Sequence, residues 1–239
     1  MNLQRLFTIT VLNILGIALF LSWFLPANHG VWFEIDKSIF FGFNHLMGES
    51  YPFAVLVALT NFRGFDLVSL LAMGALYFSF WRQCDPEGRC RMGAILITMI
   101  ITSVLLNQLG HLLPVKHPSP TGFFHHILRA GELTGIPTKD HAGDSFPGDH
   151  GIMLLSFTCF MWRYFGQRAG IWALVITLVF SLPRVMAGAH WFTDIAVGSI
   201  AIILVGMSWV LLTPLGDKMV NQFTQKLLDR RSRRVSQSR

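Results

Sequence analysis

Long uncharged apolar stretches recur along this chain and restrict it to a small set of folds. Residues 6–25 carry no charged side chain, and a helix of that length crosses the ~30 Å hydrocarbon core of a bilayer. Of the 239 residues, 52% are hydrophobic and only 13% are charged. This balance is foreign to soluble domains and to disordered chains, so we expect an all-α integral membrane protein.

Six apolar segments predict six transmembrane helices in one domain, residues 1–213, followed by a basic tail, residues 214–239. A further apolar stretch, 51–61, is too short to cross a bilayer and is expected to be a re-entrant or surface helix. Segment 31–50 mixes aromatic and charged residues, as interfacial segments do. The expected spans are 6–25, 67–81, 92–113, 151–162, 169–182 and 192–212.

Lysine and arginine are unevenly placed, which predicts an orientation. Seven of the nineteen lie in the tail, against two acidic residues there. With the amino terminus in the cytoplasm, thirteen of the nineteen fall on cytoplasmic segments, as the positive-inside rule expects. Both termini are then cytoplasmic, and the tail is expected to lie on the membrane surface rather than to bind nucleic acid. All nine histidines fall at or beyond the opposite face, which is periplasmic in a bacterium.

Three cysteines, Cys84, Cys90 and Cys159, are present. Cys84 and Cys90 flank a charged loop and suggest a metal clip, but no second pair or nearby histidine completes one. Free, reduced thiols are expected.

A polar group of Arg184, His190 and Asp194 directly precedes the last span. If a helix begins near His190, Asp194 lies one turn further on the same face. Its carboxylate can then bind one imidazole nitrogen and leave the other free to attack, while Arg184 offers a charged fork to phosphate oxygens. The simpler alternative is an interfacial segment in which His190 and Asp194 only cap a helix.

A second polar group, Lys116 and the segment 144–150, is expected on the same membrane face. His150 is expected to begin a helix, so that two imidazoles face one phosphate, one attacking phosphorus and the other donating a proton to the leaving oxygen. Lys116 would help neutralise the phosphate charge. This chemistry requires no metal or other cofactor. Taken singly, His150 can be an exposed loop histidine and Lys116 an ordinary surface lysine.

The spacing of the first group resembles the type 2 phosphatidic acid phosphatase (PAP2) superfamily. Its three sequence blocks are Lys-x6-Arg-Pro, Pro-Ser-Gly-His and Ser-Arg-x5-His-x3-Asp. Arg184, His190 and Asp194 match the third block at the family spacing, with Pro183 in place of the serine. The first block is matched least well: Lys116, His117 and Pro118 resemble only its end.

The second block is matched by Pro147 and His150, with Gly148 and Asp149 in place of Ser-Gly. The missing serine removes one phosphate donor, for which the Gly148 N–H and Ser145 can compensate. Asp149 brings an anion beside an anionic substrate unless Lys116 or Lys139 pairs with it. This departure suggests an altered acceptor or substrate choice.

The resemblance implies roles for the matched residues. His190 would be the nucleophile, Asp194 its orienting partner and His150 the general acid, with Arg184 and Lys116 binding phosphate. His117 and Asp149 are possible modulators.

Within the superfamily the chain is most similar to bacterial inner-membrane enzymes that move a phosphate from undecaprenyl diphosphate to the 1-phosphate of lipid A, through a phosphohistidine on the periplasmic side. Both lipids would be drawn from the bilayer. Aromatic-rich segments 32–43 and 51–62 can line a lateral entrance or simply form interfacial belts.

Three alternatives remain at the level of sequence. Water instead of lipid A as acceptor would make the chain a lipid diphosphate phosphatase. A haem-binding membrane electron carrier would need facing histidines inside the helices, whereas these histidines lie at one rim. A transporter would need ionisable residues or broken helices at mid-depth, which are scarce here.

Overall fold

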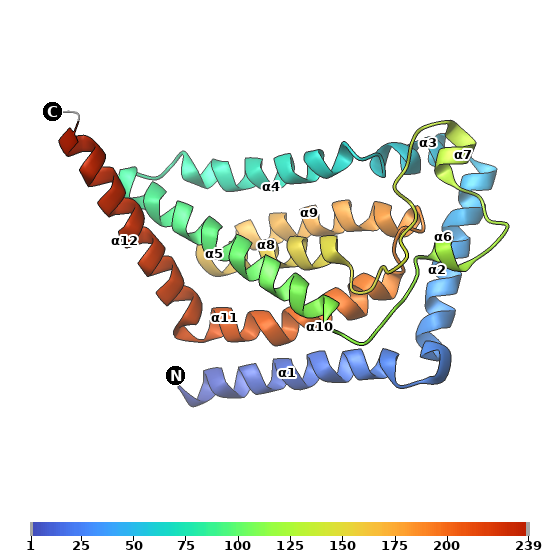
Figure 1. Ribbon diagram of the computed structural model, residues 1–239, viewed down its shortest axis with the longest axis horizontal. Coiled ribbons are helices and arrows are strands. Elements are labelled where there is room, and N and C mark those ends of the chain that lie inside the picture. Colours follow the sequence, from blue (N-terminus) through green and yellow to red (C-terminus); the bar gives the residue numbers. More distant parts are fainter. Residues whose placement is uncertain (1, 238–239) are drawn as a thin grey trace.

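The structure, a computed structural model, describes residues 2–237, with the backbone alone for 234–237. The described part is helical and contains no strand, with long helices running side by side (Figure 1). The all-α prediction is confirmed.

By length and composition, four helices can cross a membrane and a pair bent by 66° can form a fifth span. The four are α1 (Leu3–Phe24), α5 (Pro86–His111), α9 (Gln167–Met186) and the run Asp194–Leu212; the bent pair is α3 (Tyr51–Thr60) with α4 (Phe65–Trp81).

The shorter helix α8 (Asp149–Phe165) packs against α9, α5 and the run Asp194–Leu212. That run consists of π-helical turns at Asp194–Ser199 and Ile203–Met207, the α-helical turn α10 (Ile200–Ile202) and α11 (Ser208–Leu212). Glycine allows the close approach, because a Cβ at Gly151 would lie 2.4 Å from the Ser199 hydroxyl oxygen. Ile152, Phe160 and Met207 belong to the apolar core that results.

Several helices extend beyond their expected bounds, most of all α5 and α9. α5 begins at Pro86, six residues early, because the Asp85 side chain accepts the Gly88 N–H (2.8 Å) and caps the first turn. α9 continues through Pro183 to Met186. The buried Asn61 amide donates to the Pro183 carbonyl (2.8 Å) and fixes this last turn.

One end of the bundle is covered by α2 (Val31–Glu49) and by the polar segment 112–148, which contains α6 (Pro120–Phe123) and α7 (Ala130–Thr134). α2 lies across the end of the long helices (Figure 1), after the short helical turn Ala27–His29. Aromatic contacts hold the polar segment in place: Trp23 of α1 stacks on Phe146 at 4.2 Å between ring centroids, and the Trp191 indole N–H donates to the Pro118 carbonyl (2.7 Å).

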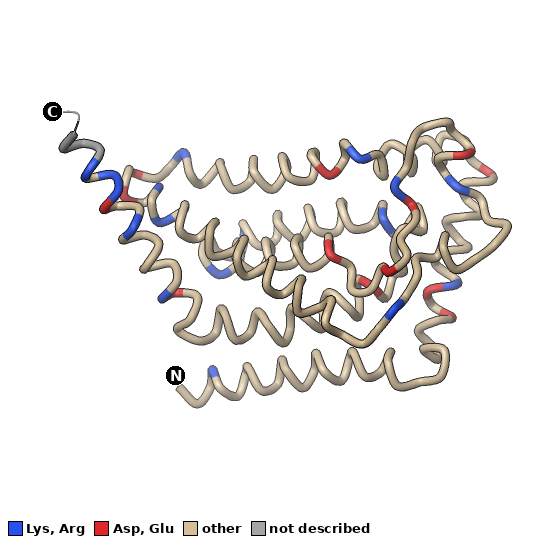
Figure 2. Tube along the Cα trace, in the orientation of Figure 1, with Lys and Arg blue, Asp and Glu red and all other residues tan. Residues whose placement is uncertain are grey.

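The opposite end carries α12 (Pro214–Gln237), which packs Val220, Phe223 and Leu227 into the core beside α5. Lysine and arginine gather along α12 and the neighbouring helix ends (Figure 2). Arg239, counted above among the tail cations, lies outside the described residues. All three cysteines have free thiols, which confirms that prediction.

Candidate active site

His190 lies in a tight turn between α9 and the last helical run. The turn closes because the backbone N–H groups of Ala189 and His190 both donate to the Arg184 carbonyl (3.0 and 3.2 Å). Gly188 adopts φ +71°, and a Cβ there would lie 2.6 Å from the Phe40 ring. Helical structure begins at Phe192, the first residue of the expected last span and two residues after His190.

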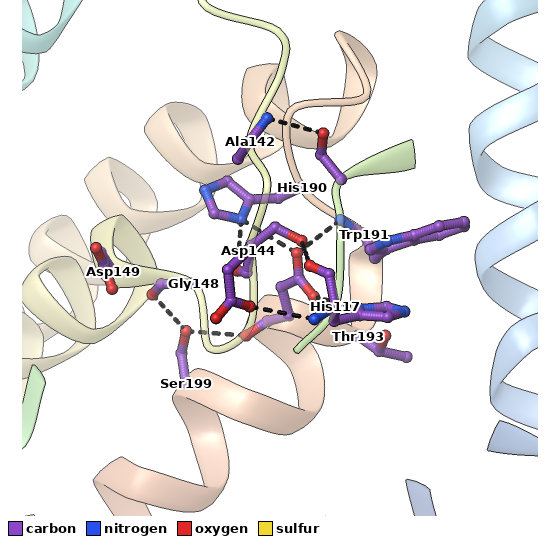
Figure 3. Close-up of polar contacts among 12 residues, drawn as sticks. His117, Ala142, Asp144, Gly148, Asp149, His190, Trp191, Thr193 and Ser199 are labelled. Carbon is purple, nitrogen blue, oxygen red and sulfur yellow. Dashed lines mark hydrogen bonds and ion pairs between the residues drawn. The ribbon is translucent and has the colours of Figure 1, made fainter. Parts of the chain in front are cut away.

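The His190 imidazole is nevertheless bound to Asp194. Its Nδ1 lies 3.1 Å from Asp194 Oδ2 and 3.0 Å from the Ser145 carbonyl oxygen. Both partners are acceptors, so Nδ1 carries a proton, and Nε2 of the neutral ring has a free lone pair. In Figure 3 the Nε2 edge of the ring points away from these partners. This arrangement can support attack by Nε2 on an electrophile.

Asp194 is fully buried and has several donors for its two oxygens. The Trp191 N–H donates to Oδ2 (2.9 Å), and His117 Nδ1 lies 3.4 Å from Oδ1 (Figure 3). The family match indicated His117 only as a possible modulator; the structure brings it and His190 to the same carboxylate. Two imidazoles and a backbone amide therefore compensate for the burial of this charge.

Ser145 and Gly148, expected to offer hydrogen bonds to phosphate, both bind protein atoms. The buried Ser145 hydroxyl donates to the His117 carbonyl (2.9 Å). The Gly148 N–H donates to the Asp194 carbonyl (3.0 Å), and Ser199 donates to the Gly148 carbonyl (2.8 Å) (Figure 3). These bonds attach the start of α8 to the start of the last helical run. The free N–H groups of the α8 first turn begin one residue later, at Asp149.

His150, the second residue of α8, contacts a residue that the motifs did not include. Its Nε2 lies 3.2 Å from Asp66 Oδ1, and the Arg184 guanidinium binds the same oxygen. Asp66 stands in the first turn of α4, next to the bend that follows Asn61. In the sequence, Asp66 is a single carboxylate at the start of an apolar segment. Such a residue by itself indicates only the end of a helix, so the sequence contained no further sign of its place in the site.

Positive charge gathers around His150. The charges of Arg184 and Lys139 act on its ring, and the Asp66 carboxylate opposes them. The backbone N–H of Lys139 donates to the Asn61 carbonyl (3.1 Å), which holds this part of the polar segment against the α3–α4 bend. Lys116 is exposed, and its ammonium makes no ion pair with a described residue. The structure therefore brings Arg184, His150, His190 and Asp194 together, but it leaves Lys116 without a contact in the group.

Asp149 points away from His190 (Figure 3), and its partner is His111 at the end of α5. Its Oδ1 lies 3.1 Å from His111 Nε2, an ion-pair distance without hydrogen-bond geometry. The two lysines considered as partners are not in contact with it. His111 therefore supplies the compensating charge when it is protonated.

Asp36 of α2 supports the site from outside. It is buried and accepts hydrogen bonds from the backbone N–H (3.0 Å) and hydroxyl of Thr193, next to Asp194. Burial raises the pKa of Asp36 to about 6, and the bonds from Thr193 oppose this shift. Among the described residues, no group of three or more His, Cys, Asp or Glu side chains is arranged to hold a metal ion.

One end of this helical bundle carries two carboxylate-bound histidines and a guanidinium, groups that suit an enzyme acting on phosphate. The chain belongs to the PAP2 superfamily, whose sequence pattern matches residues 92–215. It is 56% identical to the lipid A 1-diphosphate synthase of Escherichia coli (strain K12) over 226 residues, which cover 94% of this chain and 95% of that protein.

A second relative from the same strain is 24% identical over 146 residues, 61% of this chain and 68% of its own, and its name assigns it provisionally to the undecaprenyl-diphosphatases. No solved structure matches the chain.

Proposed function

We propose that this chain is a lipid phosphotransferase that moves a phosphate from undecaprenyl diphosphate to the 1-phosphate of lipid A. The assignment of these two substrates is supported by the 56% identity to a lipid A 1-diphosphate synthase along nearly the whole chain. One observation supports the chemistry best: His190 Nδ1 faces two acceptors, which leaves the Nε2 lone pair for phosphorus.

The reaction proceeds in two displacements. In the first, His190 Nε2 attacks the terminal phosphorus of undecaprenyl diphosphate, an N–P bond forms, and the P–O bond to undecaprenyl phosphate breaks. In the second, an oxygen of the lipid A 1-phosphate attacks the same phosphorus, the N–P bond breaks, and His190 is regenerated. Asp194 stabilises the positive charge that the ring acquires while it is phosphorylated.

The other site residues have separate roles. His150 donates a proton to the leaving phosphate oxygen, and Arg184 binds the equatorial oxygens as charge develops. A guanidinium has five N–H donors, so Arg184 can keep its contact with Asp66 and still bind phosphate. Lys116 is a long side chain that can reach the anionic substrate from the rim, as can Lys139.

We place the site on the periplasmic face of a bacterial inner membrane, with six crossings and both termini in the cytoplasm. The crossings are α1, the α3–α4 pair, α5, α8, α9 and the run Asp194–Leu212, within a membrane domain of residues 1–213. The cations along α12 and the adjoining helix ends, opposite the site (Figure 2), support this orientation. Residues 214–239 are then a basic cytoplasmic tail.

The acceptor is tested with purified protein and undecaprenyl diphosphate labelled on its terminal phosphate. With lipid A present, label should enter lipid A 1-diphosphate, and His190→Ala should abolish this product. Free phosphate released at equal rates with and without lipid A, and no doubly phosphorylated lipid A, would instead make the chain a diphosphatase, the activity that the second relative's name suggests.

A further inference from the structure

A groove of about 890 Å³ opens between α4 and α5, and residues of α8 form its floor. α4 and α5 separate from the turn that joins them and diverge toward the end of the bundle that holds the site (Figure 1). The volume lies in the range of binding pockets for small molecules, about 300–1,000 Å³.

The groove is apolar along most of its length. Two of its polar side chains are satisfied within the protein: the Tyr77 hydroxyl donates to the Met92 carbonyl (2.6 Å) and the Ser103 hydroxyl to the Met99 carbonyl (2.8 Å). Asn107 lies at the site end, and its Oδ1 is shielded from solvent without a hydrogen-bond partner among the described residues. The polar groups that remain available to a ligand therefore lie at one end of an otherwise apolar groove.

Each wall of the groove begins within about one helical turn of the site. Leu70 of α4 follows Asp66 by one turn, and Met153 of α8 follows His150 by one turn. On α5, Asn107 precedes His111, which pairs with Asp149, by one turn. A lipid whose phosphate lies at His190 and His150 would therefore pass directly into the groove.

We infer that the groove binds the isoprene units nearest the diphosphate of the donor lipid, an inference that rests on the function proposed above. The wall from Leu70 to Trp81 is about 17 Å long, roughly half the hydrocarbon thickness of a bilayer. It can hold only the headgroup-proximal part of a long polyprenyl chain. A groove between two helices fits a single chain, as the donor has, rather than the several acyl chains of lipid A.

Filling the groove tests the assignment. A Cβ at Gly74 on α4 meets no atom within 4 Å, so Gly74→Trp places an indole in the groove without displacing the backbone. The Michaelis constant for undecaprenyl diphosphate should rise at least about tenfold, the effect of about two lost methylene contacts, with kcat nearly unchanged. Gly42→Trp is the matched control, because Gly42 on α2 is equally open and lies outside the groove. Val104→Trp repeats the test from α5 and covers the case in which Gly74→Trp fails to fold.

Photolabelling tests occupancy independently of turnover. A farnesyl diphosphate analogue with a photoreactive group on its second isoprene unit should label peptides of α4, α5 or α8. Excess undecaprenyl diphosphate should prevent this labelling, and Gly74→Trp should reduce it. Labelling on other helices, or protection by phospholipid alone, would overturn the groove assignment even if phosphotransfer is intact. Failure of the wild-type protein to transfer or release phosphate would instead overturn the proposed function.

Discussion

Asp66 Oδ1 lies 3.2 Å from His150 Nε2, although the two residues are 84 positions apart. The same oxygen binds the Arg184 guanidinium, whose side chain is 6% exposed. One carboxylate at the α3–α4 bend therefore holds both the proposed general acid and the proposed phosphate-binding group. Asp66 acts through these two residues and is a positioning residue.

Asp66→Asn should lower kcat about ten- to a hundredfold, because His150 loses the charge-assisted bond that fixes its ring. The Michaelis constant for the donor should change little, since the Arg184 guanidinium has enough N–H donors to bind phosphate with or without Asp66. Steady-state kinetics with undecaprenyl diphosphate and lipid A measure both constants.

Asp217→Asn is the matched control. Asp217 also accepts from an arginine, Arg163 (3.0 Å), but at the opposite end of the bundle, so its replacement should leave kcat unchanged. Equal losses of activity in the two variants would mean that Asp66 serves general stability only.

Asp36 should give the protein a pH-dependent stability. The pKa of Asp36 is about 6 in the folded protein, because of burial, and 3.8 for the free side chain. Between these values the folded state keeps a proton that the unfolded state releases, so the free energy of unfolding should fall as pH rises from about 4 to 6 and then level off. The upper limit of the change is about 3 kcal/mol. Thermal unfolding at several pH values measures this pH dependence, and Asp36→Asn should remove the part that is due to Asp36. The same pH slope in the wild-type and variant proteins would contradict a role for Asp36 in it.

The turn that presents His190 should depend on Gly188. Gly188→Ala combines a positive φ with a Cβ 2.6 Å from Phe40, whereas Gly135→Ala has nearly the same φ, +72°, and meets nothing within 4 Å. Gly135→Ala should cost about 1 kcal/mol of unfolding free energy, and Gly188→Ala about 1–3 kcal/mol more, with loss of activity. Equal unfolding midpoints and equal activities in the two variants would exclude a special role for this turn.

The sequence predicted the helical membrane class, because apolar runs and charged turns are local features. It also placed His190, Asp194 and Arg184 in one group, since all three lie in or beside a single turn. Helix ends were less predictable. The expected span ended at residue 182, but α9 continues to Met186 because the distant Asn61 side chain binds its last turn.

The contacts of Asp66, His117 and Asp36 could not be predicted from spacing. Each joins residues far apart in the chain, and each depends on how α2, α4 and the polar segment pack over one end of the bundle. Gly148 and Ser145 illustrate the converse. Their residue types suited phosphate binding, but packing gave their donors to protein carbonyls.

Asp149 should influence the choice of acceptor. Its carboxylate stands between the start of α8 and His111, where it can repel a second anionic group or position it through His111. Asp149→Gly is expected to change the ratio of lipid A 1-diphosphate to free phosphate at equal donor consumption. An unchanged ratio, measured by chromatography of the labelled products, would remove Asp149 from acceptor selection.

The phosphohistidine at His190 is the central claim, and covalent labelling of the protein tests it most directly. Undecaprenyl diphosphate labelled on its terminal phosphate, mixed with the protein and quenched in base, should leave acid-labile label on the wild-type chain. Addition of lipid A before quenching should discharge this label into lipid A 1-diphosphate. His190→Ala should carry no label, whereas His117→Ala, which keeps the nucleophile, should still be labelled. Undiminished label on His190→Ala, or turnover by the wild-type protein without any labelled intermediate under rapid quenching, would contradict the account.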